Sequence, residues 1–151
     1  MKKIISSILT LLILVPCVLS GKPIGFKDVA GRWRLLYRGN YGYDFYFYNN
    51  YRAIVIVYLR SSAVVFRGVY TIEENNQIRI NISEMKNEPS ATNINLKSRF
   101  VKTSSSYFTF IVDREDAKGK KILSLKPGRI VIDGLDSEGY FEPVIKLDKA
   151  G

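Results

Sequence analysis

Apolar and polar residues alternate in short segments along most of the chain. From Ala30 onward, stretches rich in Val, Ile, Tyr, Phe and Thr are separated by clusters of Gly, Asn, Ser, Asp and Pro at intervals of roughly 8 to 12 residues, as in all-β domains. The pattern predicts about ten short strands and no convincing helix. The predicted strands cover residues 31–38, 43–49, 52–60, 63–72, 77–84, 94–102, 107–113, 121–126, 129–133 and 139–147.

Strict alternation assigns an inner and an outer face to several of these strands. Ile78, Ile80 and Ile82 are separated by polar residues, which predicts one buried face and one solvated face. Residues 53–59 are apolar at every position, so this strand needs cover on both faces. We expect the N-terminal segment to cross its outer face, and the alternative is an exposed interaction patch.

The connections between the predicted strands are mostly of hairpin length. Asn75–Asn76 suits a tight turn because Asn tolerates positive φ, residues 126–128 (Lys-Pro-Gly) suit a type II turn, and residues 104–106 suit a hairpin turn. Longer polar loops are expected at 84–93 and 114–120. Closing such a sheet on itself removes its exposed edges. The predicted fold is therefore all-β, an antiparallel up-and-down β-barrel of about 8–10 strands, with a sandwich as the alternative.

The N-terminus has the pattern of a secretory signal peptide. Two lysines precede an almost unbroken apolar run, and a small residue, Gly21, follows position 20. We therefore expect residues 1–20 to be a signal peptide and residues 21–151 to be the barrel domain, exported to the periplasm or the cell surface. Cys17 follows Leu14 as in the lipobox of bacterial lipoproteins, but Pro16 departs from the small residue found there. Lipidation of Cys17 and an inert signal-peptide cysteine both stay open, the inert cysteine being favoured.

Composition removes most catalytic chemistry. The 151 residues include no His and one Cys, which excludes a Cys/His zinc site, a Ser-His-Asp triad and a Cys-His pair. Acidic residues near 113–116 and 133–138 are spaced like solvated turn residues rather than a metal loop. The predicted leader carries two of the 23 basic and none of the 14 acidic residues, so the domain has a net charge of +7. We expect no enzyme activity, no cofactor, no metal and no nucleic-acid partner, but a bias toward anionic lipid or glycan surfaces.

The first predicted strand carries a family resemblance. Gly31-Arg32-Trp33 follows a short polar segment and opens the meander of strands. This resembles the G-x-W stretch of the lipocalin and calycin superfamily, and the strand blocks that follow resemble the small bacterial lipocalin-like type. The resemblance implies a barrel whose Trp plugs one end under a late basic side chain, for which Lys146 is the candidate. The chain departs from the family in lacking a recognisable C-terminal amphipathic helix and clear second and third motifs.

These observations lead to one functional hypothesis and one alternative. We expect a non-enzymatic, lipocalin-like barrel that binds a small apolar or amphiphilic molecule in its interior, with Arg67 or Arg99 holding an acyl carboxylate or phosphate. The alternative is a solid-cored scaffold whose outer face binds an anionic surface or a protein partner. The candidate interior residues are Trp33, Phe45, Phe47, Val55, Val57, Phe66, Ile78, Ile80, Ile82, Phe100, Phe108 and Phe110.

Overall fold

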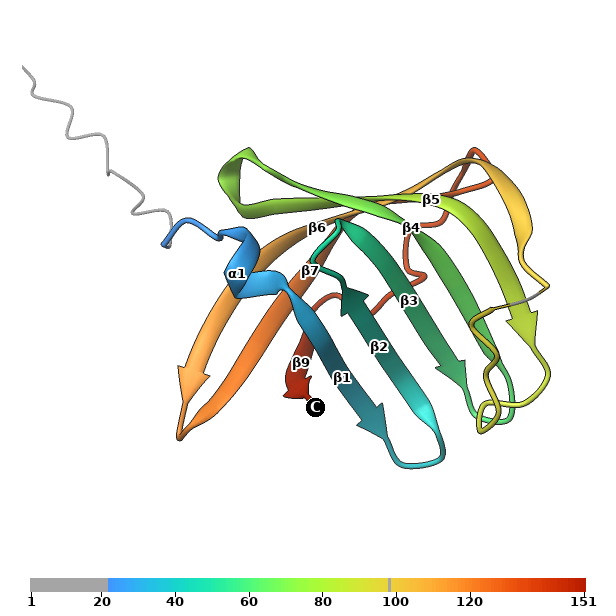
Figure 1. Ribbon diagram of the computed structural model, residues 1–151, viewed down its shortest axis with the longest axis horizontal. Helices are drawn as coiled ribbons and strands as arrows, with labels where there is room; N and C mark the ends of the chain where they lie inside the picture. Colours follow the sequence, from blue (N-terminus) through green and yellow to red (C-terminus); the bar gives the residue numbers. More distant parts are fainter. Residues whose placement is uncertain (1–21, 98) are drawn as a thin grey trace, which may run out of the picture.

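The computed structural model describes residues 22–97 and 99–151, which form a β-barrel preceded by one short helix (Figure 1). The predicted signal peptide and Cys17 lie outside these residues. No helix within them has the length and apolar character needed to cross a membrane. The elements in chain order are α1 (Phe26–Val29), β1 (Gly31–Tyr37), β2 (Tyr41–Phe47), β3 (Arg52–Leu59), β4 (Ala63–Glu73), the 3-10 turn η1 (Glu74–Asn76), β5 (Gln77–Glu88), β6 (Val101–Ala117), β7 (Lys120–Ile132), β8 (Leu135–Asp136) and β9 (Ile145–Ala150).

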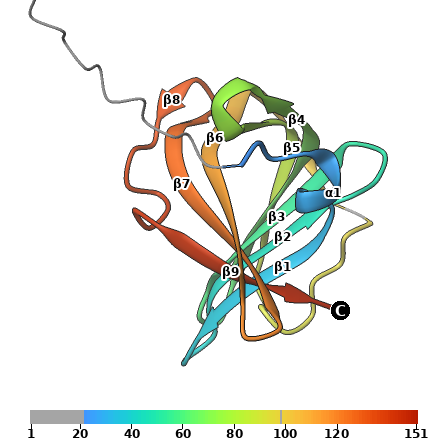
Figure 2. The same ribbon diagram turned by 90° about the vertical axis from the view of Figure 1, so that its left-hand side faces the viewer.

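Eight of the strands close into an antiparallel barrel, which confirms the predicted fold class. Strands β1 to β7 pair with their neighbours in chain order, and β9 lies between β7 and β1 (Figure 2). The short β8 adds to the edge of β7. Because β9 pairs on both sides, the barrel has no free edge at the point where the two ends of the domain meet.

The alternating segments took the predicted faces. Ile78, Ile80 and Ile82 are buried in the main apolar cluster inside the barrel, as are Phe108 and Phe110. The Asn75–Asn76 turn is also confirmed, since both residues have positive φ at the hairpin between β4 and β5. The period of two therefore gave the register wherever polar residues marked the outer face.

Two predicted turns lie within strands. Residues 126–128 belong to β7, where a bulge opposite β6 accommodates Pro127 and Gly128, and Thr109 Oγ1 accepts a hydrogen bond from the Arg129 amide at 2.7 Å. Residues 104–106 belong to β6, whose pairing with β5 also shifts there. Pro and Gly can serve a bulge as well as a turn, because a bulge also needs an interrupted ladder.

The ends of other predicted elements moved. Strand β5 continues to Glu88 and β6 begins only at Val101, so the first connection is displaced along the chain and takes the place of most of the predicted strand at 94–102. Strand β6 continues to Ala117 and β7 begins at Lys120, so the second polar loop is shorter than expected. The predicted strand at 139–147 is instead an irregular connection, residues 137–144, followed by β9. This connection, called the plug segment below, reaches the end of the barrel formed by the hairpin tips 38–40 and 60–62, called the mouth.

Candidate functional site

Most of the candidate interior residues do face the barrel interior. Eleven of the twelve lie in one buried cluster contributed by strands β1 to β6: Trp33, Phe45, Phe47, Val55, Val57, Phe66, Ile78, Ile80, Ile82, Phe108 and Phe110. Each has the strand parity that points inward. Their inward position is confirmed, whereas their part in ligand binding stays a prediction.

The interior is packed by the chain's own rings. Phe141 of the plug segment is 4% exposed, and its ring centroid lies 5.2 Å from that of Phe108, 5.3 Å from that of Phe110 and 5.7 Å from that of Tyr43. Beside it, burial raises the pKa of Tyr140 to about 12. The space that a small ligand would take in an open barrel is here occupied by a residue from a connection. Phe141 was not among the predicted interior residues, because residues 139–147 were expected to form a wall strand.

Three predicted site residues lie outside the interior. Arg67 follows the inward-facing Phe66, so strand alternation turns it outward, where it forms an ion pair with Glu84. Phe100 also lies on the outer wall, with the Arg67 guanidinium carbon 3.9 Å from its ring centroid. Arg99 is exposed in the connection before β6, with a φ of 65°. Neither arginine can hold an anion inside the barrel as expected.

The outer face of β3 is covered, although not by the N-terminal segment as expected. Ile56, Ala63 and Val65 form a second apolar cluster on the outside of β3 and β4. The connection between β5 and β6 lies over it and contributes Ile94, Leu96 and Phe100. Lys86 secures this cover, since its ammonium donates to the carbonyl oxygen of Asn95 and pairs with Glu88. As expected, a strand that is apolar on both faces is covered on its outer face, but the sequence pattern does not indicate which segment covers it.

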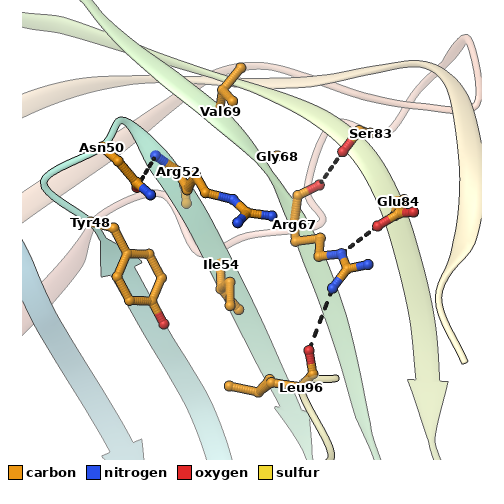
Figure 3. Close-up of a pocket in the computed structure, with 11 residues that line it drawn as sticks. Tyr48, Asn50, Arg52, Ile54, Arg67, Gly68, Val69, Ser83, Glu84 and Leu96 are labelled. Carbon is orange, nitrogen blue, oxygen red and sulfur yellow. Dashed lines mark hydrogen bonds and ion pairs between the residues drawn. The ribbon is translucent and has the colours of Figure 1, made fainter. Parts of the chain in front are cut away.

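Beside this cover lies a groove in the outer wall of β3, β4 and β5, with a volume of about 440 Å³ (Figure 3). Apolar side chains of Tyr48, Ile54, Val69 and Leu96 line it. Two strand irregularities shape it, one between Arg67 and Gly68 and one between Ile82 and Glu84. Bulges of this kind bend a strand locally and redirect its side chains.

Position 68 requires glycine because the backbone of β5 approaches it closely. A Cβ atom on Gly68 would overlap the carbonyl oxygen of Asn81 on β5. Ser83 contacts the backbone next to Gly68, since its hydroxyl donates a hydrogen bond to the Arg67 carbonyl oxygen at 3.2 Å. The position of the groove therefore depends on one glycine and one hydroxyl next to the bulge.

The groove has an excess of positive charge. The Arg52 side chain extends toward Arg67, and both arginines line the groove (Figure 3). Arg67 has Glu84 as its counter-ion, and it also donates to the Leu96 carbonyl oxygen at 3.5 Å. Arg52 forms no ion pair with any residue in 22–97 or 99–151. An unpaired guanidinium in a groove with apolar side chains is suited to a ligand with an anionic head and an apolar body.

The neighbouring outer wall carries a saturated charge cluster. The fully buried Asp44 accepts hydrogen bonds from Arg34 at 2.7 and 2.9 Å, from Arg32 at 3.1 and 3.2 Å, and from the Tyr58 hydroxyl at 2.7 Å. Burial favours the neutral acid, but these hydrogen bonds outweigh it and hold the pKa of Asp44 below its usual value. Both arginines are therefore committed to Asp44, and the cluster joins β1, β2 and β3.

The end of the barrel opposite the mouth is closed around Trp33. The indole Nε1–H donates to the Val29 carbonyl oxygen at 2.7 Å, and the Lys149 ammonium lies 4.5 Å from the indole centroid. Lys149 also donates to the Ala30 carbonyl oxygen. Gly31, with a φ of +124°, leaves the room that the Lys149 side chain takes, since a Cβ there would collide with it.

The basic residue over the tryptophan is thus Lys149 and not Lys146. Ile145 and Leu147 are buried, and Lys149 is the next residue of β9 with the same inward parity. Lys146 has the opposite parity and is exposed. Burial, together with the charges of Lys121 and Arg114, lowers the pKa of Lys149. The arrangement of a glycine, a buried tryptophan and a covering cation agrees with what the lipocalin resemblance implies for this end.

No protein-family model, no curated protein and no solved structure matches this chain. The residues 22–97 and 99–151 also contain no cluster of three or more His, Cys, Asp or Glu side chains that could hold a metal ion. The barrel, its closed end and the groove in its wall are therefore the features that bear on function.

Proposed function

We propose that this protein is an exported, non-enzymatic, lipocalin-like barrel that binds a small amphiphilic anion in the groove of its outer wall. The observation that carries the proposal is the guanidinium of Arg52, which has no ion-pair partner among the described residues and lines the same groove as the apolar side chain of Ile54. A carboxylate or phosphate head would bind Arg52, and Arg67 would add a second cation. The apolar body of the ligand would contact Ile54, Val69 and Leu96.

The packed interior favours the outer wall over the inside of the barrel. A ligand in the interior would have to displace the Phe141 ring and its contacts with Phe108 and Phe110. The groove needs no such rearrangement, and its volume of about 440 Å³ falls within the usual range for small-molecule sites, roughly 300–1,000 Å³. The groove thus combines the two hypotheses from the sequence, a small amphiphilic ligand and a solid core with a binding outer face.

A specific observation also supports the interior as a second candidate. The ring at its centre, Phe141, comes from the plug segment and not from a wall strand. Connections open more readily than paired strands, so a tightly bound apolar molecule could take the place of this ring. The two candidates place the ligand on opposite sides of the β3–β4 wall, and one experiment separates them.

The test is titration of isotope-labelled protein with dodecanoate, dodecyl phosphate and an uncharged dodecyl glycoside, each below its micelle concentration. We expect both anions to shift backbone resonances of Arg52, Ile54 and Gly68, and the glycoside to bind more weakly. Arg52→Gln should weaken anion binding by roughly 10- to 100-fold, the effect of losing a charged hydrogen bond. Arg129→Gln, which removes an exposed charge on β7, is the matched control and should change little.

The outcomes are distinct. Shifts confined to Phe45, Phe108 and Phe110 would replace the groove with the interior candidate. Equal affinities of the Arg52 and Arg129 variants would overturn the assignment of the anion to Arg52. A stronger response to one of the two anions would tell whether a carboxylate or a phosphate head is the better ligand.

Export is part of the proposal and has its own test. Sequencing the N-terminus of protein purified from the envelope fraction should find Gly21 as the first residue, as cleavage after position 20 predicts. Palmitate labelling that is lost in Cys17→Ser, together with globomycin sensitivity, would instead establish the lipoprotein alternative.

A further inference from the structure

The mouth of the barrel carries exposed apolar side chains on two adjoining hairpin tips. Tyr37, Tyr41 and Leu59 are 48%, 46% and 48% exposed. They lie side by side, since Tyr41 pairs with Tyr37 across the first hairpin and with Leu59 on β3. The amide of Arg60 donates to the Asn40 carbonyl oxygen at 3.0 Å, which holds the two tips together.

These side chains continue the inner face of the barrel wall past its rim. Tyr37, Tyr41 and Leu59 have the same strand parity as buried residues such as Trp33, Tyr43 and Val57. With Tyr140 and Glu142 they line a hollow of about 230 Å³ at the mouth. The surface they form, with Arg38 and Arg60, is called the mouth lip below. Adjacent exposed apolar groups of this size mark an interaction site more often than scattered ones do.

The charges on the two hairpin tips are of one sign. Residues 36–41 and 57–62 contain Arg38 and Arg60 and no acidic residue, and both arginines are exposed. The connection that starts beside the second tip, where the Ala91 amide donates to the Ser61 carbonyl oxygen, adds two exposed basic residues and no acidic one. Glu142 is the one acidic residue that lines the mouth hollow. It accepts the Tyr37 hydroxyl at 2.7 Å, and its other oxygen is buried.

We infer that the mouth lip docks the protein on an anionic lipid bilayer surface. Tyrosine rings suit the headgroup region because they present an apolar body and a polar tip, and arginines beside them pair with lipid phosphates. A second copy of the chain is disfavoured as the occupant, because a symmetric contact would bring the same arginines against each other. The inference does not depend on the proposed groove ligand, since the mouth lip and the groove share no lining residue.

The experiment is flotation of the processed protein with vesicles of phosphatidylcholine alone or of phosphatidylcholine and phosphatidylglycerol at 3:1. We expect binding to the mixed vesicles only, weakened by salt because the attraction is screened. Arg38→Gln with Arg60→Gln should weaken binding by about fivefold for each arginine removed. The matched control is Lys120→Gln with Lys121→Gln, which removes the same charge from the hairpin at the other end of the barrel and should have less than about a twofold effect.

A second readout reports insertion itself. Tyr41→Trp places a fluorescent ring on the mouth lip, and its emission should shift to the blue with mixed vesicles, while Trp33 stays buried in both conditions. Arg52→Gln should float like the unmodified protein, so failure of the groove proposal and failure of this inference can be told apart. Equal losses from the arginine pair and the lysine pair, or an unshifted Tyr41→Trp spectrum, would overturn the inference. Binding of a protein partner through the mouth lip without vesicle binding would overturn it as well.

Discussion

Removing the Phe141 ring should destabilise the barrel more than any change at its surface. The ring is 4% exposed and packs against rings from β2 and β6. Phe141→Ala removes about 100 Å² of buried apolar surface, or ~2.5 kcal/mol of transfer free energy. A residual cavity of about 80 Å³ adds ~2 kcal/mol. We expect the free energy of unfolding to fall by about 4 kcal/mol, a large part of the roughly 5–15 kcal/mol of a typical domain.

Urea denaturation followed by far-ultraviolet circular dichroism measures this loss. Leu135→Ala, at a site 71% exposed on β8, is the control and should cost less than about 0.5 kcal/mol. The Phe141→Ala variant should also take up benzene, since dry apolar cavities bind it, and the unmodified protein should not. A loss below about 1 kcal/mol for Phe141→Ala would refute the reasoning, because it would mean that the ring does not fill the interior in solution.

Three further predictions concern the walls and the closed end. Asp44→Asn should cost about 3 kcal/mol at pH 7, since it leaves two arginines without their carboxylate. Folding lowers the pKa of Asp44, so the ionised carboxylate stabilises the folded protein fully above the unfolded pKa of 3.8. This stabilisation is lost as the pH falls through the lower folded pKa. Urea titrations at pH 7 and pH 3 should show this loss of stability in the unmodified protein and a smaller loss in the variant. Gly68→Ala should lower the free energy of unfolding by about 1–3 kcal/mol because of its backbone collision, whereas Gly25→Ala, which has room, should change it by a few tenths; thermal melts compare the two. Lys149→Met should cost about 1 kcal/mol and alter the emission of the buried tryptophan, while Lys146→Met should leave the spectrum unchanged, and fluorescence during denaturation measures both.

Strand alternation predicted the interior because burial acts on every second residue. Ile78, Ile80 and Ile82 face inward as expected, since Arg79 and Asn81 between them could not be buried without loss. Phe108 and Phe110 face inward as well. The same rule would have placed Arg67 outside, next to the inward-facing Phe66. Arg67 was expected inside the barrel because an anionic ligand head there would need a basic partner, although its parity with Phe66 indicates the outer face.

The features that carry the candidate site were harder to predict, because they depend on contacts between distant segments. Nothing local to residues 137–144 shows that Phe141 turns into the barrel, and a Pro and a Gly serve a bulge in β7 as readily as a turn. The groove arises where two strand irregularities meet, and it has no sequence signature of its own. Lys149 could have been predicted as the residue over Trp33, since counting alternate residues from Ile145 leads to it.

The place of β9 in the barrel also sets an order of events during folding. The last strand joins β7 to β1, and its lysine bonds a carbonyl oxygen 119 positions earlier in the chain. Contacts of such long sequence separation carry a high entropic cost of loop closure and slow the folding of β proteins. Until β9 docks, β1 and β7 each present an unpaired edge to other copies of the chain. The risk of aggregation therefore falls in the interval before this one short strand has found its place.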